Sequence, residues 1–253
     1  MLNKQSPIPL YYQLAECLKE QIHAQDLAIG AQIPPERDLA SRMGVSRMTA
    51  RQAVAYLVNE GLLEVKPGVG TFVAQPKLTH NALHLLGFSE EMARLGGTVV
   101  STVLEQRIIT PLRRIAEQLQ IASHEPVVSI VRLRQVDQIP LLLETSYIPA
   151  LLCPGLESVD LAGSSLYTRL ESDYHLTVHR AAQTLEATTV NDYEQQLFHL
   201  VPGTAMLLLE GVTYNQQERP FEYFKAVYRG DRFKFMLKSQ QNGIELQSFV
   251  HSR

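Results

Sequence analysis

The sequence of 253 residues has no tryptophan, only two cysteines and no long apolar run. A helix that spans a bilayer needs roughly 20 apolar residues, and the polar N-terminus does not resemble a signal peptide. Cys17 and Cys153 have no partner at the spacing of a metal or redox motif, so we expect two free thiols. From these absences we expect a soluble, cytoplasmic protein with no membrane partner, no metal site and no cofactor.

A strong charge of one sign is also lacking. The chain has 23 basic and 26 acidic residues and a formal net charge of −3, which argues against a globally basic nucleic-acid coat but allows a local basic face. The length, together with a hydrophobic content of 45%, is typical of a globular chain with two domains.

The first part of the chain has the pattern of two helices. Leucine or isoleucine recurs every four positions, which predicts a helix over 10–26. Pro35 suits the first turn of a second helix, because its missing N–H needs no partner there. We therefore expect a short helix over 36–43 that Gly44 ends.

A third helix over 46–60 has the character of a recognition helix. Ser46 is a favourable N-cap, and one side of the helix is apolar. The opposite side carries Arg47 and Arg51, which lie four residues apart. A helix, a short turn and a second helix form the helix-turn-helix pattern, in which the second helix lies in the major groove.

Two β-prone runs, 62–65 and 71–73, flank a glycine-rich tip and predict a hairpin that acts as a wing. Lys66 and Thr71 would supply a charge and a hydroxyl to a DNA strand. Two arginines on an isolated helix are usually a solvated surface, and residues 1–75 carry seven basic and seven acidic residues. The surrounding motif, not the charge, favours DNA binding.

Residues 75–81 are polar and contain Pro76, so we interpret them as a linker between a winged helix-turn-helix domain over 1–74 and a second domain over 82–253. The second domain is predicted to be α+β, with an antiparallel sheet. Strands are expected over 99–109, 127–135, 141–147, 181–188, 205–214, 221–228 and 233–238, and helices over 89–96, over 110–119, after Ser165 and after Asn191.

Arg132 and Arg134 lie two residues apart and therefore share one face of their strand, with Glu144 on the next strand. A solvated or glutamate-paired hairpin surface is one interpretation. The strongly apolar neighbours of the two arginines favour the other, a pocket for an anion.

Four segments of the first domain, 34–37, 46–53, 57–63 and 68–73, resemble the winged-helix domain of the GntR family of bacterial transcription regulators. Segments 144–149 and 222–233 resemble the UTRA effector-binding domain of the HutC branch, whose fold is similar to that of chorismate lyase. Within that branch, segments 3–13, 87–92 and 164–167 resemble NagR-type repressors of N-acetylglucosamine use.

The resemblance implies two sets of site residues. The DNA-binding set comprises Arg37, Ser46, Arg47, Thr49, Arg51, Gln52, Lys66, Gly68, Gly70 and Thr71. In the effector-binding set, Phe88, Ser89, Arg132, Arg134, Ser165 and Tyr167 would surround a phosphate, and Glu144, Glu222 and Tyr228 would face sugar hydroxyls or the amide.

We expect a homodimeric transcription regulator, a repressor that a phosphorylated amino sugar such as glucosamine 6-phosphate or N-acetylglucosamine 6-phosphate releases from a palindromic operator. One alternative is the same type of regulator with a different small anion as effector. The other is a lyase-like enzyme built on the second domain. The chain has no HExxH, CxxC, Walker or GxSxG motif, so we expect no catalytic residues and no enzyme activity.

Overall fold

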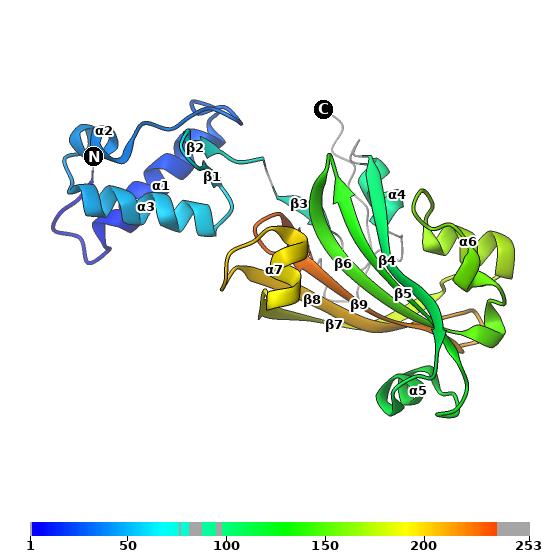
Figure 1. The fold of residues 1–253 in the computed structure, drawn as a ribbon. Coiled ribbons are helices and arrows are strands. Elements are labelled where there is room, and N and C mark those ends of the chain that lie inside the picture. The colour runs from blue at the N-terminus through cyan, green and yellow to red at the C-terminus, as the bar shows by residue number, and fades with distance from the viewer. Residues whose placement is uncertain (1, 76, 81–87, 95–97, 237–253) are drawn as a thin grey trace. The chain divides into compact units, whose positions relative to one another are not determined.

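The computed structural model describes residues 2–75, 77–80, 88–94 and 98–236, and the chain divides into two compact units, Met1–Leu78 and Thr79–Arg253 (Figure 1). Each unit has its own hydrophobic core. The division falls within the predicted linker 75–81, of which Leu78–His80 is strand β3. Pro76, positions 81–87, the end of the helix expected over 89–96 and the last residues of the strand expected over 233–238 lie outside the described residues.

The first unit is a winged helix-turn-helix, as predicted. Its core brings leucines of all three helices together with Val73 of the wing. Gly44 ends the second helix in the left-handed conformation, at φ 62°, which glycine adopts without strain. The elements are α1 (Leu10–His23), α2 (Glu36–Met43), α3 (Arg47–Asn59), β1 (Leu63–Lys66) and β2 (Gly70–Val73).

The wing is an antiparallel hairpin in which β1 pairs with β2 from Leu63 opposite Val73 to Lys66 opposite Gly70. Gln32 forms an isolated bridge to Phe72 and donates its side-chain amide to the carbonyl of Val69 at 3.1 Å. A Cβ at Gly70 would overlap the Gln32 side chain, and Gly70 has a φ of 149°. Glycine is therefore required at the base of the tip.

The second unit is built on a six-stranded antiparallel sheet with the order β4-β5-β6-β9-β8-β7, so the predicted α+β class is confirmed. A separate two-stranded sheet joins β3 to β10. The remaining strands are β4 (Val99–Ile109), β5 (Val127–Val136), β6 (Ile139–Pro149), β7 (Arg180–Thr189), β8 (Ala205–Tyr214), β9 (Pro220–Arg229) and β10 (Phe233–Phe235).

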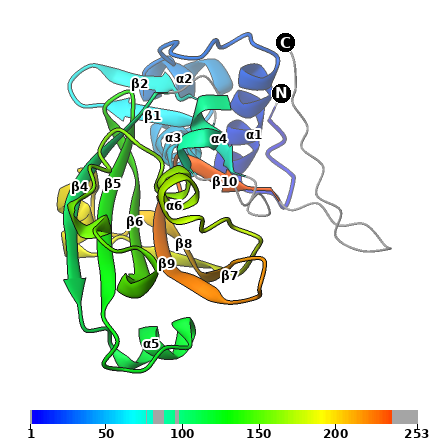
Figure 2. The ribbon, with the colours of Figure 1, turned by 90° about the vertical axis from the view of Figure 1, so that its right-hand side faces the viewer.

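Helices cover both faces of this sheet. On one face Leu166 and Leu170 pack with Ile130 of β5, and on the other Phe198 packs with Leu133. Figure 1 shows α4 and α6 on one side of the sheet and α7 on the other, and Figure 2 gives a second view of the same layers. The helices are α4 (Phe88–Arg94), α5 (Arg113–Leu119), α6 (Leu166–Tyr174) and α7 (Asp192–Phe198), with short 3-10 turns η1 (Ala150–Leu152) and η2 (Leu156–Ser158).

Three details differ from the prediction. The turn between β5 and β6 is tighter, because Asp137 and Gln138 alone take positive φ and β6 already begins at Ile139. Helix α5 starts at Arg113, not at residue 110. Strand β3 and the two 3-10 turns were not predicted. In the part of the chain that the structure describes, no helix combines the length and apolarity needed to cross a membrane.

Candidate functional site

The start of α3 is fixed by its own side chains. The Oγ of Ser46 accepts a hydrogen bond from the backbone N–H of Thr49 at 3.1 Å, and the two hydroxyls lie 2.8 Å apart. An N-cap of this kind satisfies a backbone donor that the helix cannot satisfy itself. Ser46 and Thr49 therefore hold the first turn of the helix that carries Arg47 and Arg51.

The outer side of α3 is open to solvent. Arg47, Arg51 and Gln52 are exposed, whereas Ala53 and Leu57 on the inner side are fully buried. The Nε of Arg47 lies 3.6 Å from a carboxylate oxygen of Glu36, and Arg37 lies 3.5 Å from Asp38. Exposed ion pairs contribute about 0–1 kcal/mol, so these arginines can exchange their partners for phosphates or base edges at little cost.

The tip of the wing is also exposed. Gly68 has a φ of 73°, and the Nζ of Lys66 lies 3.4 Å from Glu64 and 4.7 Å from the centre of the Phe72 ring. The carbonyl of Thr71 accepts the N–H of Ile33 at 2.9 Å. The wing thus presents one cation and a glycine next to the recognition helix, while Thr71 belongs to its hydrogen-bonded base.

In the second unit, two arginines lie on the sheet face that α6 covers. Arg132 and Arg134 are each only 2% exposed, although both belong to a residue type that is almost never buried without a partner. Both donate to the same oxygen of Glu144, at 2.8 Å and 3.0 Å. Burial alone would raise the pKa of Glu144, but the two guanidinium groups hold that pKa below its ordinary value.

One carboxylate cannot satisfy two guanidinium groups. Within the described residues the Nη1 of Arg132 and the Nε of Arg134 are buried and have no hydrogen-bond acceptor. Burial lowers the pKa of Arg134, with Glu144 opposing the shift. Buried cationic donors without an acceptor are unfavourable, and an anion that accepts both would remove that cost.

Helix α4 contributes its first two residues to the same place. Arg134 donates to the Oγ of Ser89, and its guanidinium carbon lies 5.2 Å from the centre of the Phe88 ring. The Oε1 of Glu90 accepts a hydrogen bond of 3.4 Å from Thr168 of α6. The side chains of α4 are therefore tied both to the buried arginines and to α6.

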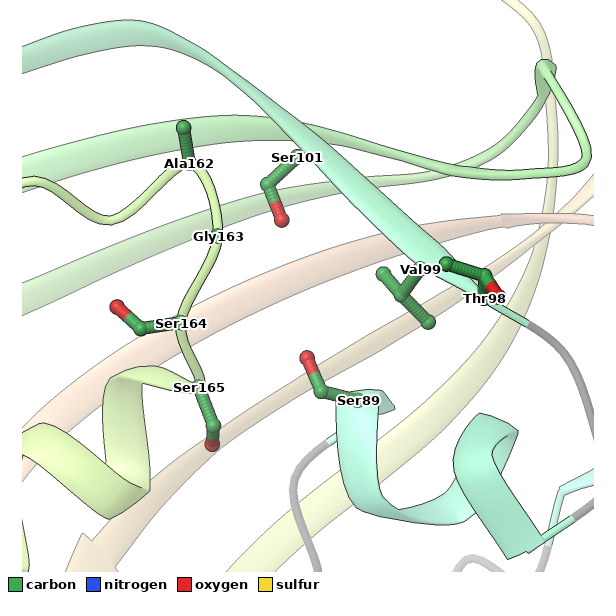
Figure 3. Close-up of a pocket in the computed structure, with 8 residues that line it drawn as sticks. All are labelled: Ser89, Thr98, Val99, Ser101, Ala162, Gly163, Ser164 and Ser165. Carbon is green, nitrogen blue, oxygen red and sulfur yellow. The ribbon is translucent and has the colours of Figure 1, made fainter.

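A cavity of about 310 Å³ opens beside Ser89. In Figure 3 the hydroxyls of Ser89 and Ser101 point into the space between α4, β4 and the loop before α6. Ser101 lies directly opposite Arg134 in the pairing of β4 with β5, so the cavity adjoins the buried arginines. Its lining is rich in hydroxyls and comprises Ser89, Thr98, Val99, Ser101, Ala162, Gly163, Ser164 and Ser165.

Farther along the same sheet face, Glu222 is held by three hydroxyls. Ser146 donates to one oxygen at 2.7 Å, and Tyr167 and Thr213 donate to the other at 2.7 Å and 3.0 Å. Burial raises the pKa of Glu222, the hydroxyl donors oppose the shift, and the nearby Glu144 adds to it. Burial and Glu222 also raise the pKa of Tyr167 well above its ordinary value.

The predicted effector residues thus form three groups. Ser89 and Ser165 line the cavity, Phe88 and Glu144 contact the buried arginines, and Tyr167 is bonded to Glu222. The ring of Tyr228 packs against Phe233 and Phe235, with centroids 5.1 Å apart in each case.

Four residues of this region were not predicted to belong to a site: Ser101, Ser146, Ser164 and Thr213. Ser146 follows Glu144 by two positions, and strand alternation places it on the same face. The same alternation gives no sign for Ser101, because β4 and β5 are separated in the sequence by helix α5. Thr213 lies opposite Glu222 in the β8–β9 hairpin, and that local pairing is the signal that could have found it. Cys17 and Cys153 are free, as expected. Among the described residues no group of His, Cys, Asp and Glu could hold a metal ion.

Two family models match the sequence. The model of bacterial regulatory proteins of the gntR family covers residues 10–73, and the UTRA domain model covers residues 94–234. The HTH-type transcriptional repressor NagR of Bacillus subtilis (strain 168) is 38% identical over 235 residues, which are 93% of this chain and 96% of that protein.

Two further relatives are also similar over nearly the whole length of this chain. The mannosyl-D-glycerate transport/metabolism system repressor MngR of Escherichia coli (strain K12) is 29% identical over 92% of this chain and 97% of its own. The crystal structure of PhnF from Mycobacterium smegmatis matches with a TM-score of 0.65 and 27% identity, over 90% of this chain and 99% of that one. The likeness therefore includes both units.

Proposed function

Since the chain belongs to the GntR family of bacterial transcription regulators and carries the UTRA domain of the HutC type, we propose that it represses its target genes until a small phosphorylated amino sugar binds the second unit. Glucosamine 6-phosphate and N-acetylglucosamine 6-phosphate are the proposed effectors. The active form is a homodimer on a palindromic operator, because one recognition helix reads only a few base pairs.

The single observation that carries the proposed effector class is the pair of buried guanidinium donors. The Nη1 of Arg132 and the Nε of Arg134 have no acceptor among the described residues, and the hydroxyl-lined cavity begins at Ser89, to which Arg134 donates. A phosphate offers several acceptor oxygens and suits both the guanidinium groups and the serine hydroxyls. The cavity volume of about 310 Å³ is in the range of small-molecule sites.

The proposed operator contact rests on exposure. Arg47 and Arg51 lie on the open side of a capped helix and are held by no strong partner among the described residues. Arginine can bind the O6 and N7 of guanine together or hold a phosphate. Arg37 and Lys66 add charge beside this face and are proposed to contact the DNA backbone.

A different small anion is the second candidate effector. The name of MngR refers to mannosyl-D-glycerate, a carboxylate, and that repressor is 29% identical to this chain. The arginine pair and the serines would accept a carboxylate as readily as a phosphate. A lyase-like activity has less support, because the relatives are named as transcription regulators and both carboxylates of this region are engaged, Glu144 by arginines and Glu222 by hydroxyls.

The test is operator release. Duplexes selected by the purified protein from a random pool are titrated by fluorescence anisotropy at fixed salt, with and without each sugar phosphate. We expect glucosamine 6-phosphate or N-acetylglucosamine 6-phosphate to weaken binding by a factor of about 5–150, the usual range for coupled sites. Equal release by the unphosphorylated sugars would contradict the proposed effector class.

A further inference from the structure

The outward side of the recognition helix α3 carries one large apolar side chain. Met48 is 61% exposed, and among the exposed residues of α3, whose whole length the structure describes, it alone is both large and apolar. A single exposed apolar residue is normal on a protein surface, so exposure alone gives Met48 no role. Its position on the helix distinguishes it from other exposed apolar residues.

The contrast with Met43 shows that Met48 is directed away from the core. Met43, at the end of α2, is half-buried and packs against the core of the first unit. Met48 is the second residue of α3, and Ala50, Ala53 and Leu57 of the same helix are fully buried. At 100° per residue these three lie roughly half a turn around the helix from Met48. The helix geometry therefore holds Met48 on the outer side.

The neighbours of Met48 on this outer side are the residues proposed to contact DNA. Arg51 and Gln52 follow Met48 by three and four positions and Ala55 by seven, so the four side chains form one stripe along the helix. All four are exposed. In a helix-turn-helix the N-terminal residues of the second helix reach the base edges in the major groove. Met48 lies at that end of α3, beside Arg51.

We propose that Met48 reads a thymine of the operator by contact with its C5 methyl group. Base edges in the major groove present hydrogen-bond donors and acceptors, and the thymine methyl is the apolar group among them. Contact between this methyl and the side chain of Met48 removes apolar surface of both from water. The unbranched thioether side chain can adapt its shape to such a contact. The inference deepens the proposed operator binding and rests on it.

The position of this thymine is constrained by Arg51. Side chains three positions apart on a helix have Cβ atoms about 5–6 Å apart, and base pairs are stacked about 3.4 Å apart. The thymine is therefore expected within about two base pairs of the guanine proposed for Arg51. In a palindromic operator each half-site contains one such thymine, because each copy of the chain contributes one recognition helix.

Val69 provides a control of the same chemical kind. It is 65% exposed and lies at the tip of the wing, between Gly68 and Gly70. The wing is expected to meet the DNA backbone or the minor groove, where no thymine methyl group projects. Any loss of affinity in Val69→Ala should therefore be the same whether or not the methyl group is present.

The test removes the methyl group and the side chain separately. The full-length protein selects operator duplexes from a random pool, and each thymine of one half-site is then replaced in turn by deoxyuridine, which lacks only the methyl. Binding is titrated by fluorescence anisotropy at fixed salt. At one thymine near the guanine proposed for Arg51, we expect the replacement to weaken wild-type binding about fourfold, the contribution of one buried methyl group.

The variants of Met48 show whether this residue makes the contact. In Met48→Ala and Met48→Gln the same replacement should have no effect, whereas Met48→Leu and Val69→Ala should keep the fourfold difference. Leucine, methionine and glutamine have similar helix propensities, so these variants change the apolar contact and not the stability of α3.

Equal weakening of the wild type and of the Met48 variants at every thymine would overturn the inference. If Arg51→Ala still lost operator affinity in that case, the proposed operator binding would stand without it. A wild type that selects no sequence from the pool would overturn the proposed operator binding, and the inference with it. A fourfold difference that disappears in Val69→Ala and persists in Met48→Ala would assign the methyl contact to the wing and overturn the role of Met48.

Discussion

Two pairs of arginines in this chain have opposite surroundings. Arg47 and Arg51 lie four residues apart on a helix and face solvent, whereas Arg132 and Arg134 lie two residues apart on a strand and are each 2% exposed. Helical spacing of four and strand spacing of two both place side chains on one face. The spacing therefore places the two members of each pair on one face, and the difference in burial is the reason why a different ligand is proposed for each pair.

The ion-pair partners differ accordingly. Arg47 shares Glu36 at 3.6 Å in solvent, an interaction that DNA phosphates can replace. Arg132 and Arg134 are buried and share the partly buried Glu144, and removal of this carboxylate leaves two buried charges uncompensated. The exposed pair suits a large partner that arrives with its own charge, and the buried pair suits a small anion that fits between fixed groups.

The largest effect is expected at Glu144. Glu144→Ala leaves two buried arginines without their shared carboxylate and should lower the free energy of unfolding by about 3–5 kcal/mol, measured by urea titration. Added sugar phosphate should stabilise this variant more than the wild type, because the anion replaces the lost carboxylate. Glu117→Ala, which breaks an exposed pair with Arg113, is the matched control and should change stability by less than about 0.5 kcal/mol.

Arg134→Ala tests whether the buried arginine pair binds the sugar phosphate. Loss of one desolvated charged contact should weaken sugar-phosphate binding by about 2–5 kcal/mol in calorimetry. Arg113→Ala removes an exposed arginine of the same unit and should leave the affinity unchanged. If both variants bound the ligand as tightly as the wild type, the buried pair would not be the anion site.

Arg51→Ala tests the exposed pair. If Arg51 reads a base edge, the variant should lose about 1–3 kcal/mol of operator affinity and bind unrelated duplexes nearly as before. Lys66→Ala on the wing is the comparison, since loss of a phosphate contact should weaken all sequences alike and reduce the salt slope by about one unit. A uniform loss for Arg51→Ala as well would reassign it to the DNA backbone.

The smallest effect concerns the pH dependence of stability. Because the pKa of Glu222 is raised in the fold, its contribution to stability is complete below the ordinary value of 4.5 and is lost as pH rises through the raised value. Glu222→Gln should therefore show a smaller fall in unfolding free energy than the wild type as pH increases from 4.5. If the free energy of unfolding fell equally with pH in both proteins, a group other than Glu222 would be responsible for the pH dependence.

Glu218 is expected to change the pH dependence of stability in the opposite direction, because its pKa is shifted in the opposite direction. Arg180 holds the pKa of Glu218 below its ordinary value, so Glu218 contributes stability above that value and loses it as pH falls. Glu218→Gln should consequently flatten the acid side of the stability curve, not the neutral side. Its exposure makes the effect small.

Capping residues in the sequence correctly predicted where several helices begin. Ser46 and Ser165 begin their helices, and Asn191 forms a capping box with Glu194, as the sequence indicates. Hydrophobic runs also located the long strands, because burial of a strand face leaves a pattern in the residues themselves. These features depend on neighbours a few positions away.

Long-range pairing left no such signal. Strand β3 pairs with β10 across more than half of the chain, and Ser101 reaches the site because β4 lies beside the loop that contains Ala162. The shared face of Arg132 and Arg134 was predictable from spacing. The donors of these arginines that lack an acceptor were not predictable. Which guanidinium nitrogens remain without one depends on which of them Glu144 and Ser89 accept from, and that is set by the three-dimensional structure.

The central claim is that the buried arginines and the exposed arginines act on one equilibrium. The most direct measurement is the affinity for glucosamine 6-phosphate in the presence and absence of saturating operator, beside the affinity for operator with and without saturating sugar phosphate. Thermodynamic linkage requires the two ratios to be equal, and we predict that each ligand weakens the other by the same factor, well above one. Two ratios equal to one would contradict the account, and mutual strengthening would reverse the sign of regulation.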